Sequence, residues 1–184
     1  QLDPTACQDL SEVIDHVGGR ADLAARVVRA IGDARARFTE DHLRLVRAVR
    51  FAAGLGFALD PATQEAVREM APLVSTVSAE RVRDEVWKLL SGPDPRRGLE
   101  LLDATGLLAH ILPEVEATKG VPQPPEFHPE GDVWTHTLLV MGCLERPTGE
   151  ASLLAAPLAV GALLHDIGKP KTLVVADWQG QLAG

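Results

Sequence analysis

Residues 37–52 read RFTEDHLRLVRAVRFA, and this stretch decides the fold. Its apolar residues recur at the spacing of one helix face, namely at Leu43, Val46 and Val49. Thr39 is a good helix cap, and the two acids after it suit a first turn, where the helix dipole favours negative charge. The pattern ends at Gly54 and Gly56. The sequence therefore predicts one helix over residues 39–53.

Helical periodicity continues on both sides of this stretch. Further helices are expected at 21–30, from Pro61 after Asp60, and at 79–90, 97–105, 133–143 and 153–165. Strand signals are weak, because aromatic residues make up only 4% of the chain and Tyr is absent. Short strands are expected at 13–17 and within 172–184. The sequence predicts a mainly α fold.

Composition indicates a packed protein without a membrane span. Hydrophobic residues make up 46% of the chain, which is too many for a disordered protein. No apolar run approaches the roughly 18 residues that a spanning helix needs. No charged-then-apolar leader opens the sequence, so we expect a cytoplasmic protein. Cys7 and Cys143 are far apart in the chain and are expected to be free thiols.

The net charge of −8 is unusual for a nucleic-acid-binding protein, but the charge is unevenly distributed. From Arg20 to Arg50 there are eight arginines and four acidic residues, a local charge of +4. A basic strip of this kind is what a phosphate-binding face needs. A solvated helix surface would account for the same run of charges, so composition leaves both interpretations open.

Glu40, Asp41 and Arg44 are expected on one turn of the predicted helix. Arg44 is four residues after Glu40 and three after Asp41, so either acid could form a local ion pair with it. A second interpretation is base recognition, because a carboxylate accepts two hydrogen bonds and a guanidinium donates several in a fixed plane. Together they can address the Watson–Crick edge of cytosine, or of adenine after a small rotation. Uracil and guanine present other patterns.

Several longer motifs carry a resemblance to a known family. They are Asp15-x-x-Gly-Gly-x-x-Asp22-Leu, Arg29-Ala-Ile-Gly-Asp33, the string from Arg37 to Ala52, Leu55-Gly-Phe-x-Leu-Asp60, and Val77-Ser-Ala-Glu-Arg81-Val-x-x-Glu85. Together they resemble the head-to-neck segment of class II tRNA nucleotidyltransferases and bacterial poly(A) polymerases. The likeness covers most of the chain. It implies a helical neck and body, with a small remnant of the head-domain sheet near the N-terminus.

The resemblance assigns roles to particular residues. In that family the residues matching Glu40, Asp41 and Arg44 form the amino-acid template that selects CTP or ATP. The resemblance implies that Asp41 and Arg44 touch the base, that Glu40 orients Arg44, and that Arg47 stacks on or flanks the nucleotide. Two further residues match a flexible loop that helps the family switch from C to A, namely Asp22 and Arg29. The alternative is that Asp22 simply caps the following helix.

The family's reaction is nucleotidyl transfer to the 3′-hydroxyl of tRNA, with two divalent metals, Mg²⁺, stabilising both oxygens. In the family the metal-binding Asp-x-Asp pair lies upstream, in a glycine-rich head domain, and this sequence does not contain it. We therefore expect no catalytic carboxylate in this chain. The resemblance implies that the chain supplies base selection and RNA binding.

A second resemblance starts at His136 and continues at the doublet His165-Asp166, which follows an apolar helix and precedes Ile-Gly-Lys169. These residues resemble the HD superfamily, in which an early His, the His-Asp doublet and a distal Asp bind divalent metals. Imidazole and carboxylate ligands suit a transition metal or Mg²⁺. Asp177 is too close to the doublet to match the distal Asp, so we expect an incomplete site.

The proline-rich residues 119–129 are interpreted as a connector between domains. The expected parts are the end of the head domain (1–34), the neck (35–95), body helices and linker (96–127), and a partial HD domain (128–184). The main hypothesis is a tRNA nucleotidyltransferase whose partners are tRNA, CTP and ATP, and no membrane. The alternatives are an HD-type phosphohydrolase, a poly(A) polymerase and a non-catalytic RNA-binding module. The HD doublet favours a tRNA nucleotidyltransferase over a poly(A) polymerase.

Overall fold

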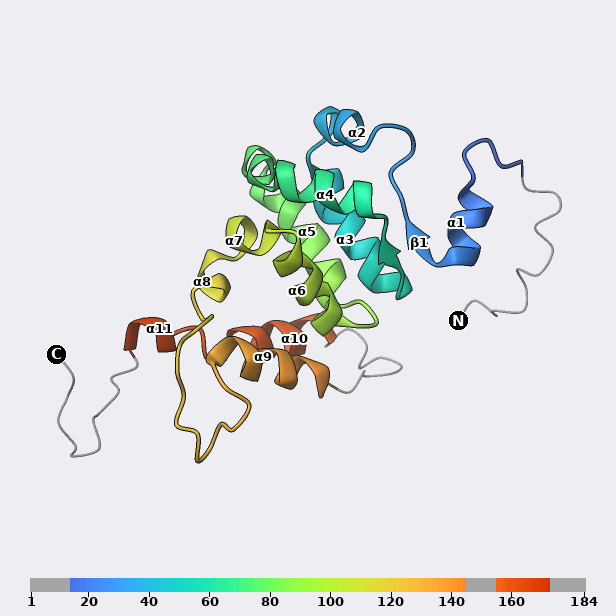
Figure 1. The fold of residues 1–184 in the computed structure, drawn as a ribbon. Helices are drawn as coiled ribbons and strands as arrows, with labels where there is room; N and C mark the ends of the chain where they lie inside the picture. The colour runs from blue at the N-terminus through green and yellow to red at the C-terminus, as the bar shows by residue number, and fades with distance from the viewer. Residues whose placement is uncertain (1–13, 145–154, 173–184) are drawn as a thin grey trace.

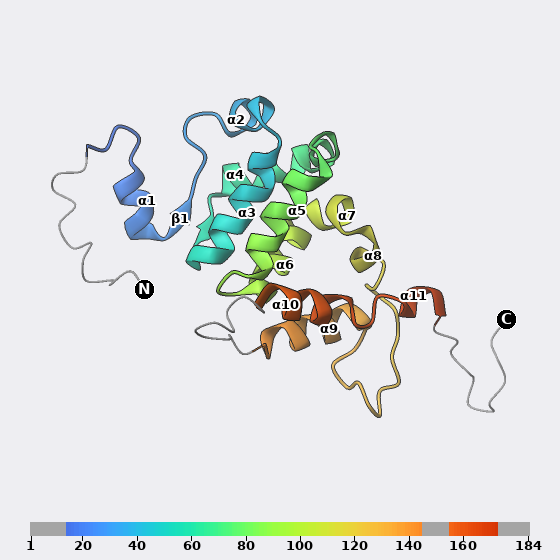
Figure 2. The same ribbon diagram turned by 180° about the vertical axis from the view of Figure 1, so that it is seen from behind.

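The computed structural model describes residues 14–144 and 155–172, and these form a mainly helical protein (Figures 1 and 2). The helices are α1 (Gly19–Ala25), α2 (Ala34–Glu40), α3 (Leu43–Leu55), α4 (Pro61–Met70), η1 (Ala71–Thr76, a 3-10 helix), α5 (Ala79–Leu90), α6 (Pro95–Ala104), α7 (Leu107–Ile111), α8 (Pro113–Glu116), α9 (Val133–Gly142), α10 (Ala155–Leu164) and α11 (Lys169–Thr172). The predicted mainly α fold is confirmed. Within these residues no helix is both long and apolar enough to cross a membrane.

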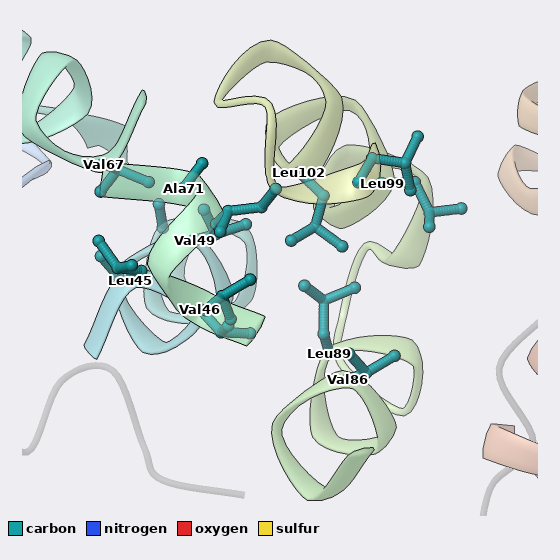
Figure 3. Close-up of a cluster of buried hydrophobic side chains, with 14 of the residues drawn as sticks. Leu45, Val46, Val49, Val67, Ala71, Val86, Leu89, Leu99 and Leu102 are labelled. Carbon is teal, nitrogen blue, oxygen red and sulfur yellow. The ribbon is translucent and has the colours of Figure 1, made fainter. Parts of the chain in front are cut away.

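Helix α3 lies at the centre of the core. Its residues Leu45, Val46 and Val49 are fully buried, and the helix contacts α5, α6 and η1. Figure 3 shows Val49 beside Leu102, with Leu89 of α5 completing the cluster. Burial of each such side chain contributes roughly 1.5–3 kcal/mol to the free energy of folding, so the packing of this helix is a major source of the stability of the fold. The buried face predicted from the sequence is confirmed.

Aspartates begin four of the helices. In each case the side chain accepts a hydrogen bond from the backbone N–H three residues later, which satisfies a donor that the helix leaves unpaired. These N-caps are Asp33 of α2, Asp60 of α4, Asp94 of α6 and Asp132 of α9. The starts predicted for α4 after Asp60 and for α9 near residue 133 are therefore confirmed by their caps.

The predicted cap at Thr39 is wrong. Thr39 lies inside α2, and its hydroxyl donates to the carbonyl of Arg35 four residues earlier. Asp41 ends α2 in an extended conformation, and its side chain accepts from the backbone N–H of Leu43 at the start of α3. The single helix expected over 39–53 is thus two helices. Gly56, with φ of 66°, ends the second one in the left-handed region that favours glycine.

The N-terminal predictions also need correction. Residues 14–17 form no strand, and residue 13 lies outside the described residues. The helix expected over 21–30 ends at Ala25, because Arg26 adopts a left-handed conformation and the chain then enters β1 (Val27–Val28). This strand pairs in parallel with β2 (Ala58–Leu59). The sheet partner is more than thirty residues away, so local sequence could not indicate it.

Helices α9 and α10 form a second layer of the protein. They pack on each other, α9 against α6 and α10 against α5, on the opposite side of the body from α2 (Figures 1 and 2). Both helices were predicted, although the expected start of the second lies outside the described residues, as does nearly all of the strand expected within 172–184. Cys143, at the end of α9, is an exposed free thiol, and Cys7 lies outside the described residues.

Candidate functional site

A cavity of about 480 Å³ opens between the loop after β1, the end of α2 and the outer face of α3. Four of its lining residues are arginines, namely Arg29, Arg37, Arg44 and Arg47. Its apolar lining includes Phe38, Ala48 and Phe51, and no acidic residue lines it. The volume lies in the range of small-molecule sites. The cavity therefore combines positive charge with an apolar surface, as a nucleotide requires.

Glu40 fixes two of these arginines. Its carboxylate accepts from Nη1 of Arg44 at 2.6 Å and from Nη1 of Arg37 at 2.8 Å. Arg44 also donates to the carbonyl of Arg37 at 3.0 Å, so its guanidinium plane has two acceptors. The hydrogen bond from Arg44 is the main reason why the pKa of Glu40 is lowered. Arg37 and Glu40 are neighbours on α2, and Arg44 joins them from the first turn of α3.

Asp41 does not line the cavity. Its carboxylate accepts from Nη2 of Arg81 at 2.9 Å and caps α3 through Leu43. Partial burial acts to raise its pKa, but the bonds from Arg81 and Leu43 outweigh this and lower it. The expected pairing of Asp41 with Arg44 on one helical turn is not observed, because the chain is extended at Asp41.

Asp22 and Arg29 form an ion pair at 3.0 Å between the first turn of α1 and the loop after β1. Arg29 also donates to Asp60 at 2.6 Å, and Asp60 caps α4. The hydrogen bond that Arg29 donates to Asp22, more than any other contact, raises the pKa of Arg29. A second cavity of about 410 Å³ has both members of this pair in its lining and shares Arg29 and Phe51 with the first. The pair therefore lies where the two cavities meet.

Phe51 provides an exposed aromatic surface at the cavity. Its side chain is 40% exposed, and the guanidinium carbon of Arg47 lies 5.9 Å from the ring centroid. Arg50 covers the ring more closely, at 4.1 Å. Aromatic rings and guanidinium planes are the usual stacking partners of unpaired bases. Sequence reasoning did not single out Phe51, Arg37 or Arg81 as site residues, although all three lie within the motifs that carry the family resemblance.

A cluster of histidines and acids forms at the start of α9 and the end of α10. His136 and His165, which are far apart in the sequence, have ring centroids 5.3 Å apart. Nε2 of His165 lies 3.2 Å from Asp166, and the ligand atoms of His136, His165 and Asp166 all lie within 4.8 Å of one another. The structure thus brings the three residues expected at the HD site together. Their imidazole and carboxylate donors fit a divalent metal with open coordination positions.

Sequence reasoning missed two neighbours of this cluster. Glu130 accepts from Nδ1 of His136 at 2.5 Å and from Nδ1 of His128 at 3.1 Å. The hydrogen bond of its own backbone amide, followed by those from His136 and His128, lowers the pKa of Glu130 to about 2. Both residues lie in the loop before α9, whose path only the folded chain reveals. On the other side of the cluster, Lys169 donates to Asp166 at 2.7 Å.

This chain is similar in sequence to one family of known proteins. Residues 56–119 match the family described as the probable RNA and SrmB-binding site of polymerase A. The "Multifunctional CCA protein" of Halorhodospira halophila is 43% identical over 165 residues, which cover 87% of this chain and 38% of that protein. The chain thus spans about two fifths of the length of the curated relatives it matches.

Solved structures of the same fold agree with the sequence match. The Bacillus stearothermophilus CCA-adding enzyme in complex with CTP is 34% identical, with a TM-score of 0.55, over 86% of this chain and 43% of that one. The Thermotoga maritima CCA-adding enzyme complexed with tRNA shares the fold at 19% identity and a TM-score of 0.52, over 84% and 40% of the two chains. The resemblance inferred from the motifs is confirmed: over most of its length this chain matches a segment of the CCA-adding tRNA nucleotidyltransferases.

Proposed function

We propose that this chain selects the base and binds RNA for a tRNA nucleotidyltransferase, which matures tRNA 3′ ends by adding C, A or both from CTP and ATP. The observation that carries the proposal is the arginine-lined cavity, whose lining includes both Arg44, which Glu40 orients, and the exposed ring of Phe51. We place this activity in the cytoplasm, with tRNA, CTP and ATP as partners.

The cavity suggests how a nucleotide is held. Arg44 is fixed by Glu40 and the Arg37 carbonyl, so its remaining N–H groups form a rigid set of donors for the edge of a base. Phe51 provides a flat surface for stacking, Arg47 flanks it, and Arg29 and Arg37 add positive charge for phosphates. In the family, carboxylates of the head domain would hold Mg²⁺, which would stabilise the charge that develops when the tRNA 3′-hydroxyl attacks the α-phosphate and pyrophosphate leaves.

We retain Asp41 as the proposed hydrogen-bond acceptor of the base-selecting template. Its carboxylate is held by Arg81 and lies in the sequence between Glu40 and the helix that carries Arg44. A shift of Arg81 away from Asp41 would free one acceptor beside the Arg44 donors. Acceptor and donor together match cytosine or adenine and reject uracil and guanine.

Binding of CTP, ATP, UTP and GTP to this chain, measured by calorimetry, tests the proposal. We expect CTP and ATP to bind more tightly than UTP and GTP, and Arg44→Ala to weaken both by roughly tenfold or more. Asp41→Ala should reduce the discrimination more than the affinity. Arg83→Ala is the matched control, because Arg83 pairs with Asp84 and does not line the cavity. Equal binding of all four nucleotides would instead favour an RNA-binding module without base selection.

The cluster of His136, His165 and Asp166 favours a second activity, metal-dependent phosphoester hydrolysis at an HD-type site. A bound divalent ion, a transition metal or Mg²⁺, lowers the pKa of water and supplies hydroxide. These three residues would hold the ion, and Lys169 adds a cation next to Asp166. Hydrolysis of a 2′,3′-cyclic phosphate with Mg²⁺, Mn²⁺, Co²⁺ or Ni²⁺, lost in His165→Ala, would support it. Absence of hydrolysis with all four metals would eliminate this activity for the chain.

A further inference from the structure

Both imidazoles at the proposed metal site have the same nitrogen occupied. Nδ1 of His165 lies 2.7 Å from the carbonyl oxygen of Ala162, and Nδ1 of His136 lies 2.5 Å from a carboxylate oxygen of Glu130. A carbonyl and an ionised carboxylate can only accept, so Nδ1 carries the hydrogen in both rings. A neutral imidazole has one donor and one acceptor nitrogen. Nε2 of each ring is therefore left with its lone pair.

Glu130 could instead be a ligand of a separate ion held with His128 and His136, since their ligand atoms also lie close together. The distances oppose this. Two ligands of one tetrahedral ion lie roughly 3.3 Å apart, given bonds of about 2.0–2.1 Å. The 2.5 Å between Glu130 and His136 is a short, charge-assisted hydrogen bond. The same nitrogen of His136 cannot donate this bond and bind an ion.

The loop around Glu130 is built to hold this carboxylate in place. Nδ1 of His128 approaches the same oxygen at 3.1 Å, and the ring of His128 meets that of His136 edge-on, with centroids 4.7 Å apart. Two residues later, Asp132 caps α9 and accepts from the backbone N–H of Gly120 at 2.6 Å, which ties the loop to the preceding segment. The hydrogen bond from His128 and the anchoring of the loop at Asp132 thus hold Glu130 in position next to His136.

We propose that Glu130 is a positioning residue that sets the tautomer and ring orientation of His136, so that His136 and His165 both present Nε2 to a divalent cation bound with Asp166. His128 supports Glu130 and is not itself a ligand. The cation part of this inference rests on the metal site proposed above. The tautomer part depends only on the contacts within this chain, and the two can be tested separately.

The tautomer is tested without metal by ¹⁵N NMR of the imidazole rings, at a pH where they are neutral. In the wild-type chain His136 should carry its hydrogen on Nδ1. In Glu130→Ala it should revert to the Nε2–H form that a free imidazole prefers, whereas Glu130→Gln, whose side-chain oxygen still accepts, should retain Nδ1–H. Glu126→Ala is the control, because Glu126 is an exposed acid in the same loop. The proposal is overturned if the tautomer of His136 is unchanged in Glu130→Ala. It is also overturned if His136 carries its hydrogen on Nε2 in the wild type.

Calorimetric titration with Co²⁺ or Zn²⁺ tests the effect on metal binding. We expect one ion per chain, bound about tenfold to a hundredfold more weakly by Glu130→Ala than by the wild type or Glu126→Ala. Two ions in the wild type, one of them lost in Glu130→Ala and in His128→Ala, would show that Glu130 is a ligand and overturn its positioning role. No binding to the wild-type chain would refute the metal site proposed above, and the NMR measurement would still decide whether Glu130 sets the tautomer.

Discussion

Among single residues, Glu85 offers a clear test of electrostatic stabilisation. Its buried carboxylate accepts from Arg50 of α3 at 2.6 Å, across the contact between α3 and α5, and from Lys88 of its own helix at 3.0 Å. Glu85→Gln would leave the largely buried Arg50 without a counter-charge, so we predict a loss of about 1–3 kcal/mol in the free energy of unfolding. Urea denaturation measures this loss. The control is Asp84→Asn, an exposed acid in the middle of the same helix, whose solvent-exposed ion pair with Arg83 contributes little to stability.

The same carboxylate predicts a pH dependence. Burial acts to raise the pKa of Glu85, but the hydrogen bonds from Lys88 and Arg50 outweigh it, and the pKa lies below its usual value. A group whose pKa is lowered on folding stabilises the protein above its unfolded pKa, and this is lost as pH falls through the folded pKa. The stability gap between wild type and Glu85→Gln should therefore be full at neutral pH and narrow in acid. A gap that stays constant with pH would contradict this assignment.

At the scale of elements, the contact between α5 and α6 depends on a glycine. A Cβ at Gly98 would overlap the side chain of Leu89, approaching its Cγ at 2.7 Å, and Leu89 is only 2% exposed and has no room to move away. Ala is the better helix former by about 1 kcal/mol, but overpacking costs about 1–3 kcal/mol. We predict that Gly98→Ala lowers the thermal midpoint. Gly161→Ala in α10, where nothing lies within 4 Å of the new methyl group, should raise it. An increase in both variants would show that the α5–α6 contact is loose.

Elements with strong local signals could be predicted from the sequence, and those set by distant contacts could not. Helix α4 was predicted because Asp60-Pro61 is a cap followed by the proline that suits a first turn. The break between α2 and α3 was not predicted, because Thr39 carries a cap signal similar to that of Asp33, which in fact caps α2. Only the burial of Phe38 and the capping of Leu43 by Asp41 decide between them. The pairing of β1 with β2 has no local signal at all.

The residues of the candidate sites also fall into two groups, those that a sequence motif identifies and those that only the folded chain identifies. Residues named by a motif, such as Arg44 and His165, could be proposed from the sequence, because a motif identifies a residue by its neighbours in the chain. Glu130 could not, because its importance comes from the path of the loop before α9, which directs it to His136. The sequence also could not show that Asp41 bonds to Arg81, forty residues away, rather than to Arg44.

At the scale of the whole molecule, the two candidate sites lie on opposite sides of the body. The arginine cavity lies by α2 and α3, whereas the histidine cluster lies at α9 and α10, with α5 and α6 between these layers (Figures 1 and 2). Substitutions that are well separated and share no partners act nearly independently. His165→Ala should therefore leave nucleotide binding unaffected, and Arg44→Ala should leave metal binding unaffected.

The uneven charge of the molecule leads to a final prediction about tRNA. The chain has a net charge of −8, so RNA must bind at a surface where basic side chains are concentrated. Arg47 is an exposed arginine that lines the cavity. Each phosphate contact releases counterions, so affinity falls linearly with salt on logarithmic axes. Arg47→Ala should weaken tRNA binding and reduce that slope by about 0.7–0.9, the value for one phosphate contact. Filter binding over a range of salt concentrations measures it, with Arg83→Ala as the control. An unchanged slope with weaker binding would mean that Arg47 stacks on a base, and an unchanged affinity would remove it from the RNA-binding surface.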